Sequence, residues 1–169
     1  FRPFHSLTRL VDAVVGLDGV RLLLVGDGPE RPAVERHARD RGVGVTFTGT
    51  VPHLELSRYL AAMDAAVVVA PEHGEFHYSP LKLAEYLAAG LAVIAPDVPT
   101  VASRLVHDRH CLLVSPHALA GLTAAIGTLR DDRELRSRLA REGRREAEAE
   151  FSWDHQVRRV QSKLASLVR

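Results

Sequence analysis

Residues 20–26 read VRLLLVG, and this apolar run closed by a glycine decides the fold class of the 169-residue chain. Such a run is typical of a β-strand that is buried on both of its faces. Four later runs repeat the pattern: VGVTFTG (43–49), AAVVVA (65–70), LAVIAP (91–96) and CLLVSP (111–116). The sequence therefore predicts a sheet of buried strands.

Amphipathic segments alternate with these runs and predict helices. Four lie between the expected strands, at 29–41, 54–63, 80–89 and 99–106, and another at 6–15 precedes them. Three more close the chain, at 117–129, 133–150 and 153–168. Strand–helix–strand alternation at this spacing requires right-handed crossovers and a parallel sheet covered on both faces. We therefore expect an α/β fold, a doubly wound Rossmann-like sheet in a single domain spanning 1–169.

Such sheets bind ligands at the carboxyl ends of their strands, near the point where the strand order reverses. The loops of interest are therefore those after Val25, Phe47, Ala70, Ala95 and Val114.

Composition narrows the function classes. The 22 basic and 21 acidic residues give a formal net charge of +1, so no overall basic field favours nucleic-acid binding. Cys111 is the sole cysteine, which excludes an intramolecular disulfide and disfavours a cysteine-based zinc site. The sequence shows no signal peptide. It also contains no apolar run that approaches the ~20 residues needed for a membrane-spanning helix, so a cytoplasmic location is the default expectation.

The loop APEHGEFHYSP (70–80) leads directly into a predicted helix. Ser79 is a good N-cap, and Pro80 suits the first helical position because its missing N–H would be unpaired there. The amides around Leu81 and Lys82, at the positive end of the helix dipole, would form an anion site. Lys82 would add a full positive charge.

Glu85 follows Lys82 by three residues and is better placed to accept hydrogen bonds from sugar hydroxyls than to face the same anion. Together the segment suits a ligand with phosphates at one end and a ribose at the other. The alternative is that Ser79 and Pro80 merely cap the helix, while Lys82 and Glu85 are solvated.

Other segments carry weaker signals. VGDGPER (25–31) places Gly26 at a strand-to-helix turn, but it lacks the Gly-Lys-Ser/Thr of a P-loop, so a purely structural turn is equally compatible. FTGTVPH (47–53) could expose backbone to a planar base or form a plain turn. His73 and His77 lie in a Pro- and Gly-containing loop, where helical metal-ligand spacing does not apply, and no metal is expected.

Taken in order, these pieces resemble one family. LLLVGDGPER, VTFTGTVPHLELSRYLAAMDAAVVVAP, SPLKLAEYLAAGLAVIAPDVP, LLVSP and FSWDHQVRRV are similar to the C-terminal half of glycosyltransferase family 4, the group 1 transferases of GT-B fold. The resemblance covers residues 22 to about 160. It implies a domain that binds a nucleotide-sugar donor, with an acceptor domain before it and the active site between the two.

The resemblance also implies residue roles. By position, the amides of Ser79, Leu81 and Lys82 would meet the diphosphate, and Glu85 would hold the ribose hydroxyls. Thr50 and Val51 would lie beside the base. Arg2 or His5 would grip the diphosphate. Pro80, which has no N–H to donate, and Gly26 complete the expected binding residues. The reaction would retain anomeric configuration and need no bound metal; the donor would be a UDP-, GDP- or ADP-sugar.

The sequence departs from the family pattern in two respects. His77 stands where the family often has a glutamate near the sugar, and Glu75 could substitute for it. The domain's first strand and the acceptor half are both missing before Phe1, so the chain is expected to be an incomplete and inactive fragment. A homodimer across the exposed sheet edge is possible, as is membrane contact through the missing half. The apolar positions of the last helix, around Trp153, are expected to be exposed.

Three other functions remain open. A catalytically silent nucleotide-sugar-binding or partner domain of the same fold is favoured by His77 in the acidic position. A GT-B UDP-sugar epimerase would need an acid/base pair reaching the sugar. A flavodoxin-like or receiver-type module would need acidic residues clustered at strand ends, whereas Asp27, Asp64 and Asp97 are scattered along the chain.

Overall fold

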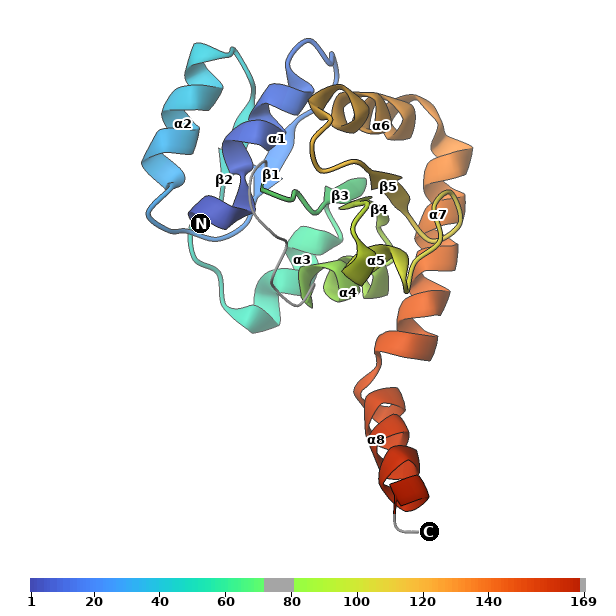
Figure 1. Cartoon of the computed structure of the whole chain (residues 1–169). Helices are drawn as coiled ribbons and strands as arrows, with labels where there is room; N and C mark the ends of the chain where they lie inside the picture. Colours follow the sequence, from blue (N-terminus) through green and yellow to red (C-terminus); the bar gives the residue numbers. More distant parts are fainter. Residues whose placement is uncertain (72–80, 168–169) are drawn as a thin grey trace.

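The computed structural model describes residues 1–71 and 81–167 (Figure 1). Within these ranges five short strands form two parallel sheets. The first pairs β1 (Leu22–Leu24) with β2 (Val45–Phe47), and the second has the order β3 (Ala65–Val67), β4 (Ala92–Pro96), β5 (Leu112–Val114). The parallel α/β architecture expected from the sequence is confirmed.

Helices cover both sides of these strands (Figure 1). They are, in chain order, η1 (Pro3–His5), α1 (Leu7–Val14), α2 (Arg31–Asp40), η2 (His53–Glu55), α3 (Leu56–Leu60), α4 (Leu81–Ala88), α5 (Pro99–Ala102), α6 (Leu119–Asp131), α7 (Arg133–Glu146), the π-helical turn η3 (Ala147–Phe151) and α8 (Trp153–Leu167).

Strand β4 shows why its sequence reads as a continuous apolar run. All five of its residues are buried. Because side chains alternate along a strand, Val93 and Ala95 pack on one face, in a cluster with α4 and α5, and Ala92 and Ile94 pack on the other, with α1 and α6. A polar residue at any of these positions would meet one of the two cores.

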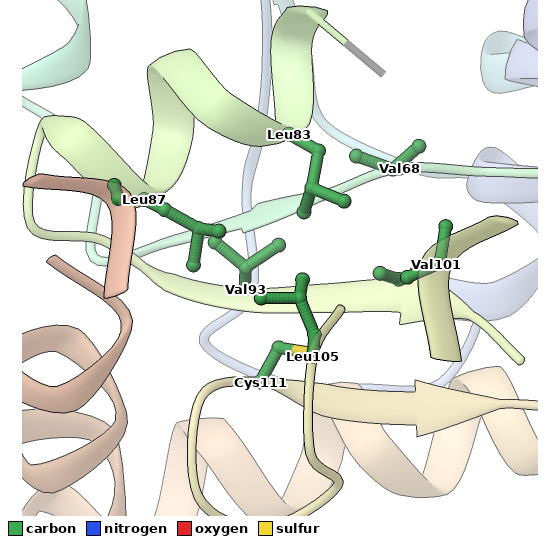
Figure 2. Packing of buried hydrophobic residues seen from close by; sticks show 9 residues of the cluster. Val68, Leu83, Leu87, Val93, Val101, Leu105 and Cys111 are labelled. Atoms are coloured by element: carbon green, nitrogen blue, oxygen red, sulfur yellow. The ribbon is translucent and has the colours of Figure 1, made fainter. Parts of the chain in front are cut away.

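The cluster on the α4 side is drawn in Figure 2. Val93 lies at its centre, surrounded by Leu83 and Leu87 of α4 and by Leu105 and Cys111. Burial raises the pKa of the Cys111 thiol to about 12, so this cysteine is a small core residue and not a nucleophile or thiolate ligand at neutral pH.

Three predicted helices differ from the observed ones by more than two residues at an end. The segment expected at 99–106 is helical only to Ala102, because the chain then turns to bury Leu105 in the core. The segment at 54–63 forms η2 and α3, which ends at Leu60. The segment at 133–150 ends as an α-helix at Glu146 and continues as the π-helical turn η3.

Helix α8 projects away from the rest of the molecule (Figure 1). Its apolar side chains are exposed, as expected, and Trp153 is 83% exposed; the others are Val157, Val160 and Leu164. None of the helices in residues 1–71 and 81–167 combines the length and apolar character needed to cross a membrane.

Candidate functional site

The first turn of α4 brings Lys82 to the N-terminal segment at the carboxyl edge of the sheet. The Nζ atom of Lys82 lies 3.2 Å from Nε2 of His5, although 77 residues separate them in sequence. Lys82 and Glu85 are one helical turn apart and therefore share a face of α4. His5, Lys82 and Glu85, together with Phe1, line one cavity of about 790 Å³.

This cluster has more hydrogen-bond donors than acceptors. The backbone N–H of Arg2 donates to Nδ1 of His5 over 3.2 Å, which in a neutral imidazole leaves the proton on Nε2. Nε2 then presents an N–H toward the ammonium of Lys82, which is also a donor. Two donors facing each other need an acceptor between or beside them, and an anion such as a phosphate would supply it.

The pKa shifts of His5 and Lys82 also favour an anion at this position. Burial, with the nearby charge of Lys82 next in size, lowers the pKa of His5 from 6.5 to about 4. Desolvation lowers the pKa of Lys82, and the carboxylate of Glu85 opposes that shift. At neutral pH His5 is therefore uncharged, and Lys82 carries the positive charge of the pair.

The His5 shift predicts a pH dependence of stability. As the pH falls from 6.5 toward 4, the unfolded chain takes up a proton at His5 that the folded chain does not, so the free energy of unfolding falls. His5→Gln removes this linkage and should flatten the decline of stability over that window, measured by urea unfolding at several pH values. His53→Gln, at an exposed imidazole, is the matched control. A His5→Gln profile parallel to that of the parent chain would contradict the assignment.

The residues expected near the base lie on the β1–β2 side of the carboxyl edge. Gly26 takes a φ of 118° and its N–H donates to the carbonyl of Gly49 over 3.0 Å, which ties the two strand ends together. Thr50 and Val51 follow Gly49 directly. Among the described residues, those lining the His5–Lys82–Glu85 cavity do not include Gly26, Thr50 or Val51.

The remaining predicted site residues divide into two groups. Arg2 is exposed and joins the cluster through its backbone, and Leu81 begins α4 with 67% of its surface exposed. The others, His77, Ser79 and Pro80, fall outside the described residues, as do His73 and Glu75.

The sequence did not point to a second cluster beside β2. Arg31 bridges Asp27 (3.0 Å) and Glu35 (2.7 Å), and its guanidinium lies 5.4 Å from the centre of the Phe47 ring. The Gly28 N–H, with Arg31 next in effect, lowers the pKa of Asp27. The spacing of four between Asp27, Arg31 and Glu35 is the signal that could have found this cluster.

Residues 1–71 and 81–167 contain no group of three or more His, Cys, Asp or Glu side chains that could hold a metal ion. The His5–Lys82–Glu85 cluster offers an ammonium, an imidazole and a carboxylate.

Comparison with known proteins identifies the family. The model of the family "Glycosyl transferases group 1" matches residues 4–132. A glycogen synthase of Mycobacterium tuberculosis is 28% identical over 139 residues, which are 80% of this chain and 32% of that protein. A GDP-mannose-dependent alpha-(1-6)-phosphatidylinositol monomannoside mannosyltransferase of the same organism is 28% identical over 158 residues, 90% of this chain and 40% of that protein.

A solved structure shares the fold. Anabaena Alr3699/HepE in complex with UDP and glucose superposes with a TM-score of 0.85 at 20% sequence identity, covering 98% of this chain and 46% of that one. The chain thus spans from about a third to just under a half of the length of these relatives. Its arrangement of strands and helices matches the fold of these glycosyltransferases. Because the family model matches most of its length, the chain belongs to the group 1 glycosyl transferases.

Proposed function

We propose that this chain is the donor-binding part of a retaining glycosyltransferase that moves a sugar from a nucleoside diphosphate sugar to an acceptor hydroxyl. The observation that carries the proposal is the cluster of His5 and Lys82, an excess of donors at the carboxyl edge of a parallel sheet, with Glu85 in the same cavity. Diphosphate oxygens are the acceptors that such a cluster lacks.

The roles follow from the chemistry of each group. Lys82 and His5 would bind the diphosphate and stabilise the charge that grows on it as its bond to the anomeric carbon breaks. The amides of Ser79, Leu81 and Lys82 would add donors at the start of α4. Glu85 would accept hydrogen bonds from the ribose hydroxyls. The acceptor oxygen would bond to the same anomeric carbon, and groups that position it would come from polypeptide beyond this chain.

The relatives support the donor class without selecting the base. One is named as GDP-mannose-dependent, and one solved structure holds UDP and glucose. A UDP-, GDP- or ADP-sugar therefore remains the expected donor of this chain, bound as a substrate and not as a resident cofactor.

The first experiment measures thermal unfolding of the chain with UDP, GDP, ADP and their common sugars, beside a Glu85→Ala variant. A nucleotide present at 100 times its dissociation constant should add about 2.7 kcal/mol to the free energy of unfolding. We expect one nucleotide to stabilise the chain and Glu85→Ala to reduce or abolish that gain. Glu55→Ala, at an exposed carboxylate near α3, should leave the gain unchanged. Equal stabilisation of the parent chain and Glu85→Ala would overturn the ribose role.

A further inference from the structure

Helix α2 begins at Arg31, on the β1–β2 side of the molecule (Figure 1). The Arg31 side chain is held by three contacts. Its Nε donates to Glu35 over 2.7 Å, its Nη1 donates to Asp27 over 3.0 Å, and its guanidinium lies 5.4 Å from the centre of the Phe47 ring. Because a planar fork that bonds two carboxylates has little rotational freedom, this side chain is fixed although 30% of it is exposed.

The fixed guanidinium lies against the turn in which the chain leaves β2. Gly49 takes a φ of 71° there, in the left-handed region. A methyl group at Gly49 would stand 3.6 Å from Nη1 of Arg31 and 3.8 Å from Oδ2 of Asp27, which are ordinary contact distances. The Arg31–Asp27 pair therefore packs directly on the backbone of this turn.

The turn is also tied to the end of β1. The Gly49 carbonyl accepts from the Gly26 N–H over 3.0 Å and from the Thr48 hydroxyl over 2.8 Å. The same Gly26 N–H also lies 3.3 Å from the Thr48 hydroxyl oxygen. The turn is thus held by hydrogen bonds as well as by the guanidinium, and Thr50 and Val51 follow it directly.

The charges around Arg31 argue against a direct contact with a diphosphate. Arg31 is paired with Asp27 and Glu35, so the three side chains together carry a net negative charge. Such a group repels an anion, whereas the ammonium of Lys82 attracts one. Arg31 therefore serves the turn and leaves the binding of phosphate to Lys82.

The turn is nonetheless connected with the cavity that His5, Lys82 and Glu85 line. The ring of Phe1 packs edge-on against the Phe47 ring at 6.3 Å, and Phe1 also lines that cavity. Phe1 therefore contacts both the cavity and the cluster at the end of β2. A nucleotide with its phosphates at Lys82 that extends past Phe1 would bring its base to the turn.

We propose that Arg31 is a positioning residue for the base of the donor, because it holds the turn at Gly49 so that the backbone of Thr50 and Val51 is in place before the base binds. The role toward the base rests on the proposed function, whereas the hold on the turn needs no nucleotide. A segment that is ordered in advance loses less conformational freedom on binding, so Arg31 contributes to affinity and to discrimination between bases. It acts through Gly49 and does not touch the nucleotide.

The first measurement uses no nucleotide. Hydrogen exchange of the Gly26 amide reports opening of its bond to Gly49, and Arg31→Ala should make this exchange at least about tenfold faster than in the parent chain. Arg138→Ala is the matched control, because Arg138 forms an ion pair of the same length, 3.0 Å, with Asp108 in the segment before β5. It should leave exchange at Gly26 unchanged. Exchange that Arg31→Ala does not alter, or that both variants accelerate equally, would show that Arg31 does not hold the turn.

The second measurement separates positioning from a general loss of structure. UDP, GDP and ADP share the ribose and the diphosphate, so a loosened chain binds all three more weakly to the same extent. Arg31→Ala should instead weaken binding of the preferred nucleotide about tenfold and that of the other two less, which narrows the preference for one base. Titration calorimetry measures the three dissociation constants for the parent chain, Arg31→Ala and Arg138→Ala.

A conservative variant completes the set. Arg31→Lys keeps the positive charge but loses the planar fork, so it should restore the preference only in part. It also takes the place of Arg31→Ala in both measurements if the alanine variant does not fold.

The positioning role and the proposed function fail in different ways. If the parent chain binds none of the three nucleotides, the proposed function and the role toward the base are both wrong, and exchange at Gly26 still decides whether Arg31 holds the turn. If the parent chain prefers one nucleotide and Arg31→Ala keeps that preference in full, the proposed function stands and the positioning role is overturned. The same conclusion follows if Arg138→Ala narrows the preference as much as Arg31→Ala does.

Discussion

Gly143→Ala is expected to lower the free energy of unfolding by about 1–3 kcal/mol, the usual cost of overpacking a core. This is the opposite of what helix propensity alone predicts, since alanine is better than glycine inside a helix by about 1 kcal/mol. The reason lies in the packing of α7. A methyl group at Gly143 would stand 2.7 Å from the carbonyl oxygen of His110 and 2.7 Å from Cδ2 of Leu87.

Neither neighbour can move easily. The His110 oxygen is backbone, in the segment leading into β5, and Leu87 is fully buried against β4 (Figure 2). Gly143 is therefore the point at which α7 approaches α4 and the His110 segment closely. The substitution has to shift one of these elements, and urea unfolding would measure the cost.

Gly127→Ala in α6 is the matched control. Its methyl group would meet only Leu17 Cδ2, at 3.9 Å, an ordinary van der Waals contact. This variant should be more stable than the parent chain, by up to about 1 kcal/mol, because it gains helix propensity without a clash. If both substitutions stabilise the chain, the inference that α7 packs closely against its neighbours at Gly143 is wrong.

Contacts between a helix and the core, such as the packing of α7 at Gly143, could not be predicted from the sequence. The parallel α/β class followed from the periodicity of runs such as 91–96, because a strand buried on both faces must be apolar at every position. The end of α5 did not follow. Residues 99–106 carry an amphipathic pattern, yet Leu105 reaches the core only after the helix has ended at Ala102.

The candidate site, too, has features that the sequence could predict and features that it could not. Lys82 and Glu85 could be placed on one face of a helix from their spacing alone, and the rule that ligands bind at carboxyl ends of strands predicts at which edge of the sheet they lie. The contact between Lys82 and His5 could be anticipated only through family resemblance, because no local pattern links residues 77 positions apart. The Arg31–Phe47 contact joins a helix to a strand end and was missed for the same reason.

Lys82→Ala is expected to weaken binding of the preferred nucleoside diphosphate by about 10- to 150-fold, because hydrogen bonds to charged groups contribute roughly 1.5–3 kcal/mol. Lys82 is the charged member of the pair with His5, so its loss removes the ammonium that would face the diphosphate. Titration calorimetry with the nucleotide selected by thermal unfolding would measure the change. In a longer protein with transferase activity, the same substitution should lower kcat by about 10²–10³-fold.

The chain supplies a matched control for the charge. Lys163, its other lysine, lies exposed on α8, far along the chain from the carboxyl edge, and Lys163→Ala should leave the dissociation constant unchanged. Lys82→Arg keeps the charge in a larger planar group and should recover part of the affinity.

Raising the salt concentration should weaken binding to the parent chain more than to Lys82→Ala, since the variant has lost the contact that salt screens. Equal affinities of Lys82→Ala and Lys163→Ala would show that the diphosphate binds elsewhere, and the excess of donors around His5 would then need a different anion.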